Sequence, residues 1–352
     1  MHFNPTAITF IGYLVLMVMI GFYAWHHTRS FGDYILGGRK LGGLVTALSV
    51  GASDMSGWLL MGVPGAAYIA GVSESWIAIG LTIGAWLNWK LVAARLRLYT
   101  EVSHNALTLP DYFRQRFEDK SHWLAVSAAA VILVFFTIYC ASGMVAGARL
   151  FENTFHLPYS TALWLGAIAT IAYVFIGGFL AVSWTDTIQA SLMCIALIVT
   201  PVAVMIDLGG ASAATSQVAA INLDMLSMMN GQTTIGIISL LAWGLGYCGQ
   251  PHILVRFMAT RSIRVIPNAR RISITWMIFC LAGSVAAGFF GAAFFAGHPE
   301  LAGAVTENHE RVFIELAKAL FNPWIAGVLM SAILAAVMST LSCQLLVCSS
   351  TL

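Results

Sequence analysis

The chain has 352 residues, of which 59% are hydrophobic and only 9% are charged. A charged fraction so far below the roughly 25% of ordinary domains excludes a water-soluble globular protein. The formal net charge of +2 gives no reason to expect a nucleic-acid partner. The composition therefore predicts a membrane protein. Motifs of phosphate-binding and hydrolytic enzymes are absent from the sequence, so we do not expect an enzyme.

Apolar stretches long enough to cross a hydrocarbon core of about 30 Å recur along the whole chain. They predict about nine membrane helices, near residues 7–25, 43–71, 74–95, 122–150, 160–177, 179–207, 233–258, 270–296 and 323–350. After the third, Thr108 is expected to cap a short surface helix with Pro110 at its start. Another short helix is expected before the ninth, and four apolar residues share one of its faces: Val312, Phe313, Leu316 and Leu320.

The lysine and arginine residues predict the orientation, because cytoplasmic loops retain positive charge. If the N-terminus lies outside, all 17 fall on the inner side except Arg149, Arg311 and Lys318. This assignment places Arg256 with the cytoplasmic charges at the end of the seventh segment. The sequence therefore predicts a multi-pass protein with its N-terminus outside.

Two of these segments are interrupted by glycine and polar residues. They read "SVGASDMSGWLLMG" over 49–62 in the second segment and "LLAWGLGYCGQPHI" over 240–253 in the seventh. In transporters built from inverted repeats, paired broken helices at corresponding positions mark a substrate site near the midplane. The two breaks lie five segments apart. A repeat of five helices is odd in number, so the second repeat has the opposite orientation in the membrane. The pattern predicts an all-α membrane transporter with inverted repeats.

Asp54 lies inside the first interruption. A charge at the centre of a membrane helix costs about 2.5–3.5 kcal/mol on insertion scales, so Asp54 should face a polar cavity or a partner. Its carboxylate either supports the binding of an ion or substrate, or accepts hydrogen bonds from backbone N–H groups that the break frees. Ser56 is the only candidate nucleophile near it, and no histidine is expected beside it within the membrane.

Hydroxyl, acidic and aromatic residues elsewhere are further candidates. Ser339 and Thr340 offer hydroxyls that, with freed carbonyl oxygens, suit a hard monovalent cation, although such hydroxyls often only bond the carbonyl one turn back. Asp186 either meets the dipole at the start of the sixth segment or lines a polar exit route for a cation. Four aromatic residues near the breaks suit a small saturated ring: Trp58, Tyr139, Trp243 and Tyr247.

Several stretches closely resemble the solute:sodium symporter family, and within it the members that carry proline. They are "ALSVGASDMSGWLLMG", "NALTLPDYF", "FFTIYCASG", "GGFLAVSWTDT", "AWGLGYCGQPHIL", "ARRISITWM" and "NPWIAGVLMSAILAAVMSTLSCQLLVCSS". The resemblance implies a LeuT-like 5+5 inverted-repeat fold in one transmembrane domain, 1–352, with an extra helix at 7–25, a first repeat at 43–207 and an incomplete second repeat at 233–352. Because family members continue further, it also implies that the chain is C-terminally truncated, without the last helices of the second repeat.

The resemblance further implies sodium-driven uptake of L-proline by alternating access in the bacterial cytoplasmic (inner) membrane. Beyond the co-transported sodium ion it implies no organic cofactor, and it implies no obligatory protein partner. Three alternatives stay open. In the first, the substrate is another small carboxylate such as pantothenate. In the second, amino-acid transport is coupled to protons, and in the third the chain is a membrane sensor that binds without transporting.

The site residues carried over from the resemblance fall into three groups. The sodium ligands would be the carbonyl oxygens of Ala52, Met55 and Ala336 and the hydroxyls of Ser339 and Thr340. Asp54, Asp186 and Arg39 would support sodium binding and coupling. Proline would lie between the broken helices, near Ser56, Gly57, Trp58, Tyr139, Trp243, Tyr247 and Pro251.

Overall fold

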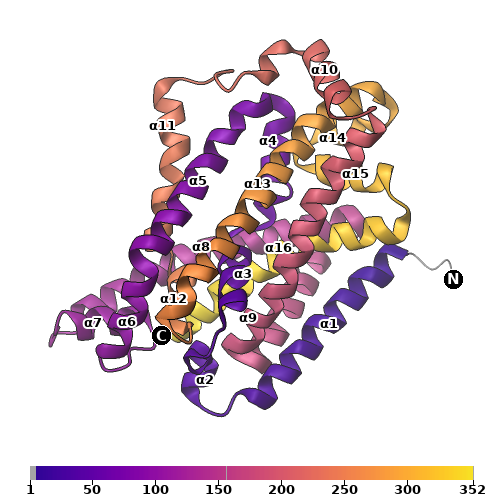
Figure 1. Ribbon diagram of the computed structural model, residues 1–352. Coiled ribbons are helices and arrows are strands. Elements are labelled where there is room, and N and C mark those ends of the chain that lie inside the picture. The colour runs from indigo at the N-terminus through magenta and orange to yellow at the C-terminus, as the bar shows by residue number, and fades with distance from the viewer. Residues whose placement is uncertain (1–4, 156, 352) are drawn as a thin grey trace.

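The computed structural model describes residues 5–155 and 157–351, and this part of the chain is built from helices (Figure 1). Within it, six helical stretches are long and apolar enough to cross a membrane. They are Pro5–His27, Gly57–Val102, Trp123–Glu152, Tyr159–Asp207, Ile263–Gly297 and Pro323–Thr351. The prediction of an all-α chain with several membrane-spanning helices is confirmed.

Eleven helices of the described chain lie in or adjoin the segments that the hydropathy pattern predicts. They are α1 (Pro5–His27), α3 (Gly43–Asp54), α4 (Gly62–Ala70), α5 (Ser75–Asn88), α6 (Ala94–Val102), α8 (Trp123–Phe155), α9 (Tyr159–Asp207), α11 (Thr234–Ala242), α12 (Pro251–Ala259), α13 (Ile266–Gly297) and α16 (Pro323–Thr351). The other helices lie at the two ends of the molecule (Figure 1): α2 (Phe31–Leu36), α7 (Leu109–Arg116), α10 (Ala211–Ile221), α14 (Gly303–Glu307) and α15 (Val312–Leu320).

Both short helices expected from the sequence are present. The Thr108 side chain accepts a hydrogen bond from the backbone N–H of Asp111, and Pro110 lies in the first turn of α7. In α15, Val312, Phe313 and Leu316 are buried. Val312 and Leu316 pack into a small cluster with residues of α9, α13 and α14, and Phe313 packs into the main core.

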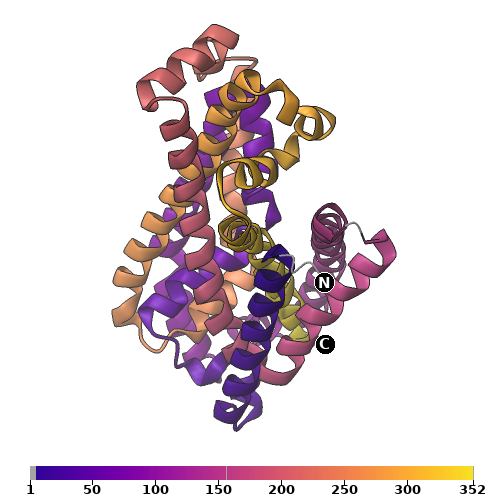
Figure 2. The ribbon, with the colours of Figure 1, turned by 90° about the vertical axis from the view of Figure 1, so that its right-hand side faces the viewer.

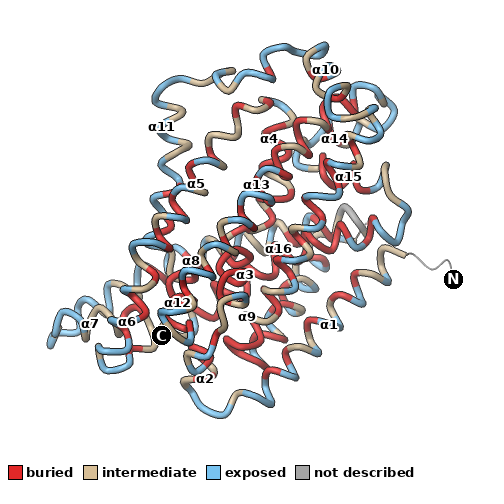
Figure 3. Tube along the Cα trace, in the orientation of Figure 1, coloured by how far each residue is buried: buried red, intermediate tan, exposed pale blue. Residues whose placement is uncertain are grey.

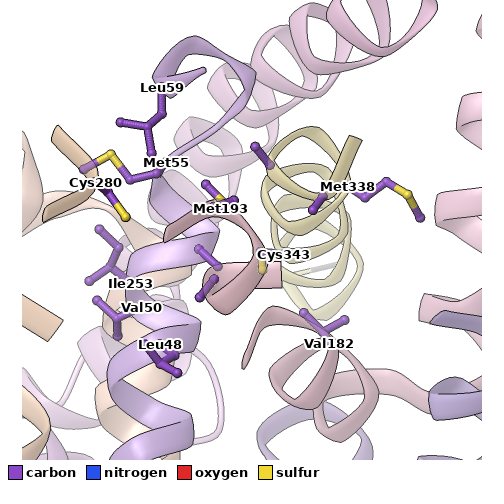
Figure 4. Packing of buried hydrophobic residues seen from close by; sticks show 14 of the residues in the cluster. Leu48, Val50, Met55, Leu59, Val182, Met193, Ile253, Cys280, Met338 and Cys343 are labelled. Atoms are coloured by element: carbon purple, nitrogen blue, oxygen red, sulfur yellow. The ribbon is translucent and has the colours of Figure 1, made fainter. Parts of the chain in front are cut away.

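Helix α16 forms the centre of the molecule. In its most apolar window 89% of the residues are buried, against 17% in α8, which lies at the periphery (Figures 2 and 3). The side chains of α3, α9, α12, α13 and α16 form one continuous apolar core, part of which is drawn in Figure 4. Any polar group on the inner face of α16 is therefore shielded from lipid.

Three breaks interrupt helices at positions expected from the sequence. Gly178 has φ 57° and ψ −146°, so α9 bends sharply there into two limbs. The bend agrees with the prediction that one segment ends at 177 and the next begins at 179. A side chain at Gly178 would lie 2.6 Å from the Tyr34 ring, so both the backbone angle and the packing need glycine. The other two breaks separate α3 from α4 and α11 from α12, at the interruptions seen in the sequence.

Candidate functional site

The break after α3 is an inverse γ-turn centred on Met55. Met55 has φ −80° and ψ 84°, and the Ser56 N–H donates to the Asp54 carbonyl at 3.0 Å. The last regular helical bond runs from Met55 N–H to Gly51 O at 3.1 Å. Because Ser56 turns its N–H away, the Ala52 carbonyl has no donor from its own helix and is free for a side chain or an ion.

Helix α16 presents hydroxyls to this free carbonyl. The Ser339 Oγ is 2.8 Å from Ala52 O and 3.0 Å from Ala336 O. The Thr340 Oγ1 is buried and has no hydrogen-bond partner among the described residues. Three of the five expected sodium ligands are thus in direct contact, Thr340 is adjacent to them in sequence, and Met55 is buried at the break.

Asp54 faces the second broken segment rather than these oxygens. The Tyr247 hydroxyl donates to its Oδ2, and the Nε2 of His252 lies 4.0 Å from its Oδ1. His252 is 1% exposed, and neither ring nitrogen has a hydrogen-bond partner among the described residues. The expectation that no histidine lies beside Asp54 is wrong, because α12 folds back and places its first turn next to the end of α3.

Asp186 and Arg256 form a buried ion pair that the sequence analysis missed. The Arg256 Nη2 lies 2.9 Å from Asp186 Oδ2, and both side chains are at most 1% exposed. Asp186 lies two turns after the Gly178 bend, beyond the first turn where the helix dipole acts, so the dipole interpretation is wrong. Arg256, counted with the cytoplasmic charges at the end of the seventh segment, is not a solvent-facing charge, because it lies inside α12 facing the core.

This pair joins four helices. Arg256 Nε donates to the Ser49 Oγ at 2.6 Å, and the Ser49 hydroxyl donates to Asp186 Oδ2, also at 2.6 Å. The Cys343 thiol of α16 contacts both members of the pair. Ser49 lies one turn before Ala52 on α3, and Cys343 lies one turn after Ser339 on α16. The ion pair therefore fixes α3 and α16 directly beside the expected sodium ligands.

A cavity of about 370 Å³ lies between the two broken segments. Its lining includes Asp54 and five of the seven residues expected to contact proline: Ser56, Trp58, Tyr139, Trp243 and Tyr247. The rings of Trp58 and Trp243 stack across it, with centroids 6.3 Å apart and planes 7° apart. Two larger hollows, of about 570 and 670 Å³, have no charged residue in their lining, so they are less suited to an ionic ligand.

The remaining two residues of that group lie next to this cavity. Gly57 lines a neighbouring hollow of about 190 Å³ that also contains Thr340. Pro251 is the first residue of α12 and lines the hollow of about 670 Å³, while its neighbour Gln250 lines the cavity itself.

The segment that carries the aromatic residues, Trp243–Gly249, is held by close backbone contact with α5. A side chain at Gly84 would lie 2.1 Å from the Gly244 carbonyl oxygen, and one at Gly80 would lie 2.6 Å from the Leu241 carbonyl oxygen. Asn88 adds a hydrogen bond of 2.8 Å to the Tyr247 carbonyl. The positions of Trp243 and Tyr247 thus depend on small residues in α5.

Arg39 lies away from the cavity, in the short turn Gly37–Arg39 before α3. Its guanidinium donates to four groups: Asn105 Oδ1, Thr100 Oγ1, Met258 O and Ala106 O. Burial, together with the nearby Arg97 charge, lowers the pKa of Arg39 to about 10. Arg39 touches none of the expected sodium ligands, so any influence on sodium must pass through α3 or α12.

Comparison with known proteins adds a second line of evidence. Residues 34–352 match the model of the Sodium:solute symporter family. The chain is 67% identical to the Sodium/proline symporter of Escherichia coli (strain K12) over 347 residues, which cover 99% of this chain and 69% of that protein. It is 60% identical to the Sodium/proline symporter of Haemophilus influenzae over 354 residues, 99% of this chain and 70% of the relative.

Among solved structures, the fold is similar to that of a Na+-coupled sialic acid symporter in a substrate-bound outward-open state. The TM-score is 0.86 at 21% sequence identity, and the match covers 99% of this chain and 73% of the other. At this identity the likeness concerns the fold. The family match and the identity to its members agree with the broken helices and the polar site, and the chain belongs to the sodium:solute symporter family.

Proposed function

We propose that this chain carries out sodium-driven uptake of L-proline by alternating access. One observation carries the proposal: neutral oxygens of α3 and α16 converge beside an aromatic cavity that contains a single carboxylate, Asp54. Its close relatives carry the name Sodium/proline symporter. The aromatic walls suit the apolar ring of proline, and the neutral oxygens suit a sodium ion. Transport of this kind needs no organic cofactor and no enzymatic group.

The proposed sodium ligands are the carbonyl oxygens of Ala52, Met55 and Ala336 and the hydroxyls of Ser339 and Thr340. Oxygen ligands suit a hard cation. Asp54, held by Tyr247, would support the ion from the cavity side, and Asp186 would do so by keeping α3 and α16 in register. Arg39 would influence coupling through the ends of α3 and α12.

Proline would lie in the cavity of about 370 Å³, with its ring against Trp58, Tyr139 and Trp243. Its carboxylate would meet free backbone N–H groups at a helix break, where orphan donors and the helix dipole favour an anion. Ser56, Gly57, Tyr247 and Pro251 would shape the remaining walls.

The finer architecture is also a proposal. It comprises about nine membrane segments, with α1 as an extra helix before two inverted repeats at 43–207 and 233–352. The N-terminus would lie outside the bacterial inner membrane, which places α2, α6 and α7 at the cytoplasmic end. The paired breaks in the chain, one in each proposed repeat, support this arrangement.

Uptake of labelled proline into proteoliposomes tests the function. With an inward tenfold sodium gradient and about 100 mV, negative inside, one sodium ion per proline could sustain roughly 500-fold accumulation. We expect uptake with this gradient and none when potassium replaces sodium. Equal uptake without sodium, or uptake driven by a pH jump alone, would contradict sodium coupling.

Trp243→Ala is expected to weaken proline binding by about tenfold, because it removes one of the two stacked rings from the cavity wall. Proline-dependent changes in intrinsic fluorescence or equilibrium binding of labelled proline measure it. Trp164→Ala, at an exposed position of α9, is the matched control and should leave binding unchanged. An unchanged affinity in Trp243→Ala would remove this residue from the proposed site.

Gly84→Ala is expected to lower proline affinity by about tenfold as well, because its methyl group would push the Gly244 backbone away. The displaced segment carries Trp243 and Tyr247. Gly249→Ala is the control, since a side chain there would meet nothing within 4 Å. If both variants bind proline equally well, the backbone contact does not position the aromatic residues.

A further inference from the structure

The C-terminal end of α12 is capped by groups from a distant part of the chain. The last carbonyls of a helix lack donors from the helix itself. Here the Met258 carbonyl accepts from Arg39 Nη1 at 2.7 Å, the Ala259 carbonyl from Leu41 N–H at 3.2 Å, and the Thr260 carbonyl from Arg97 Nε at 2.5 Å.

A backbone bridge extends this cap. Arg261 N–H donates to Leu41 O at 2.9 Å, so Leu41 and Thr260 pair like residues of two parallel strands. We call the donors Arg39, Leu41 and Arg97, with the acceptor residues 258–260, the α12 clasp. Its donors lie immediately before α3 and on α6, and its acceptors end the second broken segment.

The clasp lies on the path from the cavity to one end of the molecule. Helices α3 and α12 pack against each other, and the clasp lies at the end of the molecule that carries α2, α6 and α7 (Figure 1). Asp54 ends α3 at the cavity, and Gln250 precedes α12 there. Moving the far end of α12 away from both α3 and α6 at this level requires all three carbonyls to lose their donors.

The clasp holds two like charges close together. Arg97 is 6% exposed and lies close enough to Arg39 for their charges to interact. Two like charges are tolerated there because Glu101 pairs with Arg97 at 2.7 Å and the carbonyl end of α12 favours cations. When α12 moves away, Arg39 and Arg97 each lose one carbonyl acceptor, the Met258 and Thr260 carbonyls.

We propose that Arg97 is a positioning residue for transport, and that the α12 clasp keeps the proline cavity closed toward this end of the molecule. Release of the clasp is one step in opening the cavity to that side, together with separation of Arg256 from Ser49 of α3. The proposal rests on the proposed function, because it assumes alternating access. Arg97 touches neither the cavity nor the sodium ligands, so it acts only through α12.

The first measurement needs no transport. Hydrogen exchange by mass spectrometry reports the protection of the Leu41 and Arg261 amides in the whole chain. Arg97→Gln should lose that protection, and Arg97→Lys, which keeps the charge but not the planar fork, should lose part of it. Arg95→Gln is the control, because Arg95 lies on the same helix but is exposed. Unchanged protection in Arg97→Gln would overturn the proposal.

The second measurement is efflux of labelled proline from preloaded proteoliposomes in which the clasp end of the protein faces the proline. Because a charged hydrogen bond corresponds to about tenfold or more in an equilibrium constant, Arg97→Gln should speed efflux about tenfold, and Arg95→Gln should not. Lost protection with unchanged efflux would make the clasp a structural cap only and overturn its gating role. Absence of proline binding by the unaltered chain would instead refute the proposed function, whatever the exchange data show.

Discussion

Arg256→Gln is expected to destabilise the protein by about 3–5 kcal/mol, because it leaves the Asp186 carboxylate buried without its cation. The lost guanidinium also donates to Ser49 and to the His252 carbonyl, so three elements lose a partner at once. Thermal unfolding of the detergent-solubilised variant, followed by circular dichroism, measures the effect. Proline binding in membranes should fall together with the amount of folded protein.

Two further variants separate charge from packing. Asp186→Asn combined with Arg256→Gln removes both charges and should recover most of the lost stability, since a neutral pair leaves no isolated charge. Arg149→Gln breaks an exposed pair with Glu152 and should cost less than about 1 kcal/mol. If the double variant is as unstable as Arg256→Gln alone, the loss arises from side-chain packing rather than from an unpaired charge.

Thr340→Val is expected to raise the half-saturating sodium concentration at least about tenfold, because it removes one hydroxyl from the proposed ligands while keeping the side-chain shape. Its stability should not fall, since the Thr340 Oγ1 has no hydrogen-bond partner among the described residues. Sodium-dependent proline binding at fixed proline concentration gives the half-saturation value, and thermal unfolding gives the stability.

Thr200→Val is a matched control for that experiment. Its Oγ1 is also buried without a partner in the described structure, but it lies in α9 and lines none of the hollows around the site. We expect wild-type sodium dependence for it. Equal sodium dependence in both variants would remove Thr340 from the ligand set, and the proposed site would then need another oxygen.

Hydropathy and local chemistry predicted the helices and their breaks. The bend at Gly178 and the cap at Thr108 follow from interactions within a few residues, which a single sequence records directly. The two broken segments were visible for the same reason, because glycine and polar residues interrupt an apolar run. The resemblance to the family then indicated which oxygens to examine.

Contacts between distant helices could not be predicted in this way. Arg256 was counted with the cytoplasmic charges because a charge near the end of an apolar segment is more often solvated than buried. Its partner Asp186 lies in another helix, and nothing local to either residue reveals the pairing. His252 was missed beside Asp54 for the same reason. A charged residue that fits an orientation rule can still be a buried partner.

The close packing of α5 against residues 243–249 has a mechanical consequence. Glycine backbones touch there with no side chains between them, so this half of the broken segment cannot slide without moving α5. The far end of α12 is fastened to residues before α8. Between these two anchorages, Gln250 has extended backbone angles, φ −78° and ψ 107°, and forms a joint. Rotation of α12 about Gln250 therefore requires release of this far anchorage and separation of Arg256 from Asp186 and Ser49, while the aromatic walls keep their places.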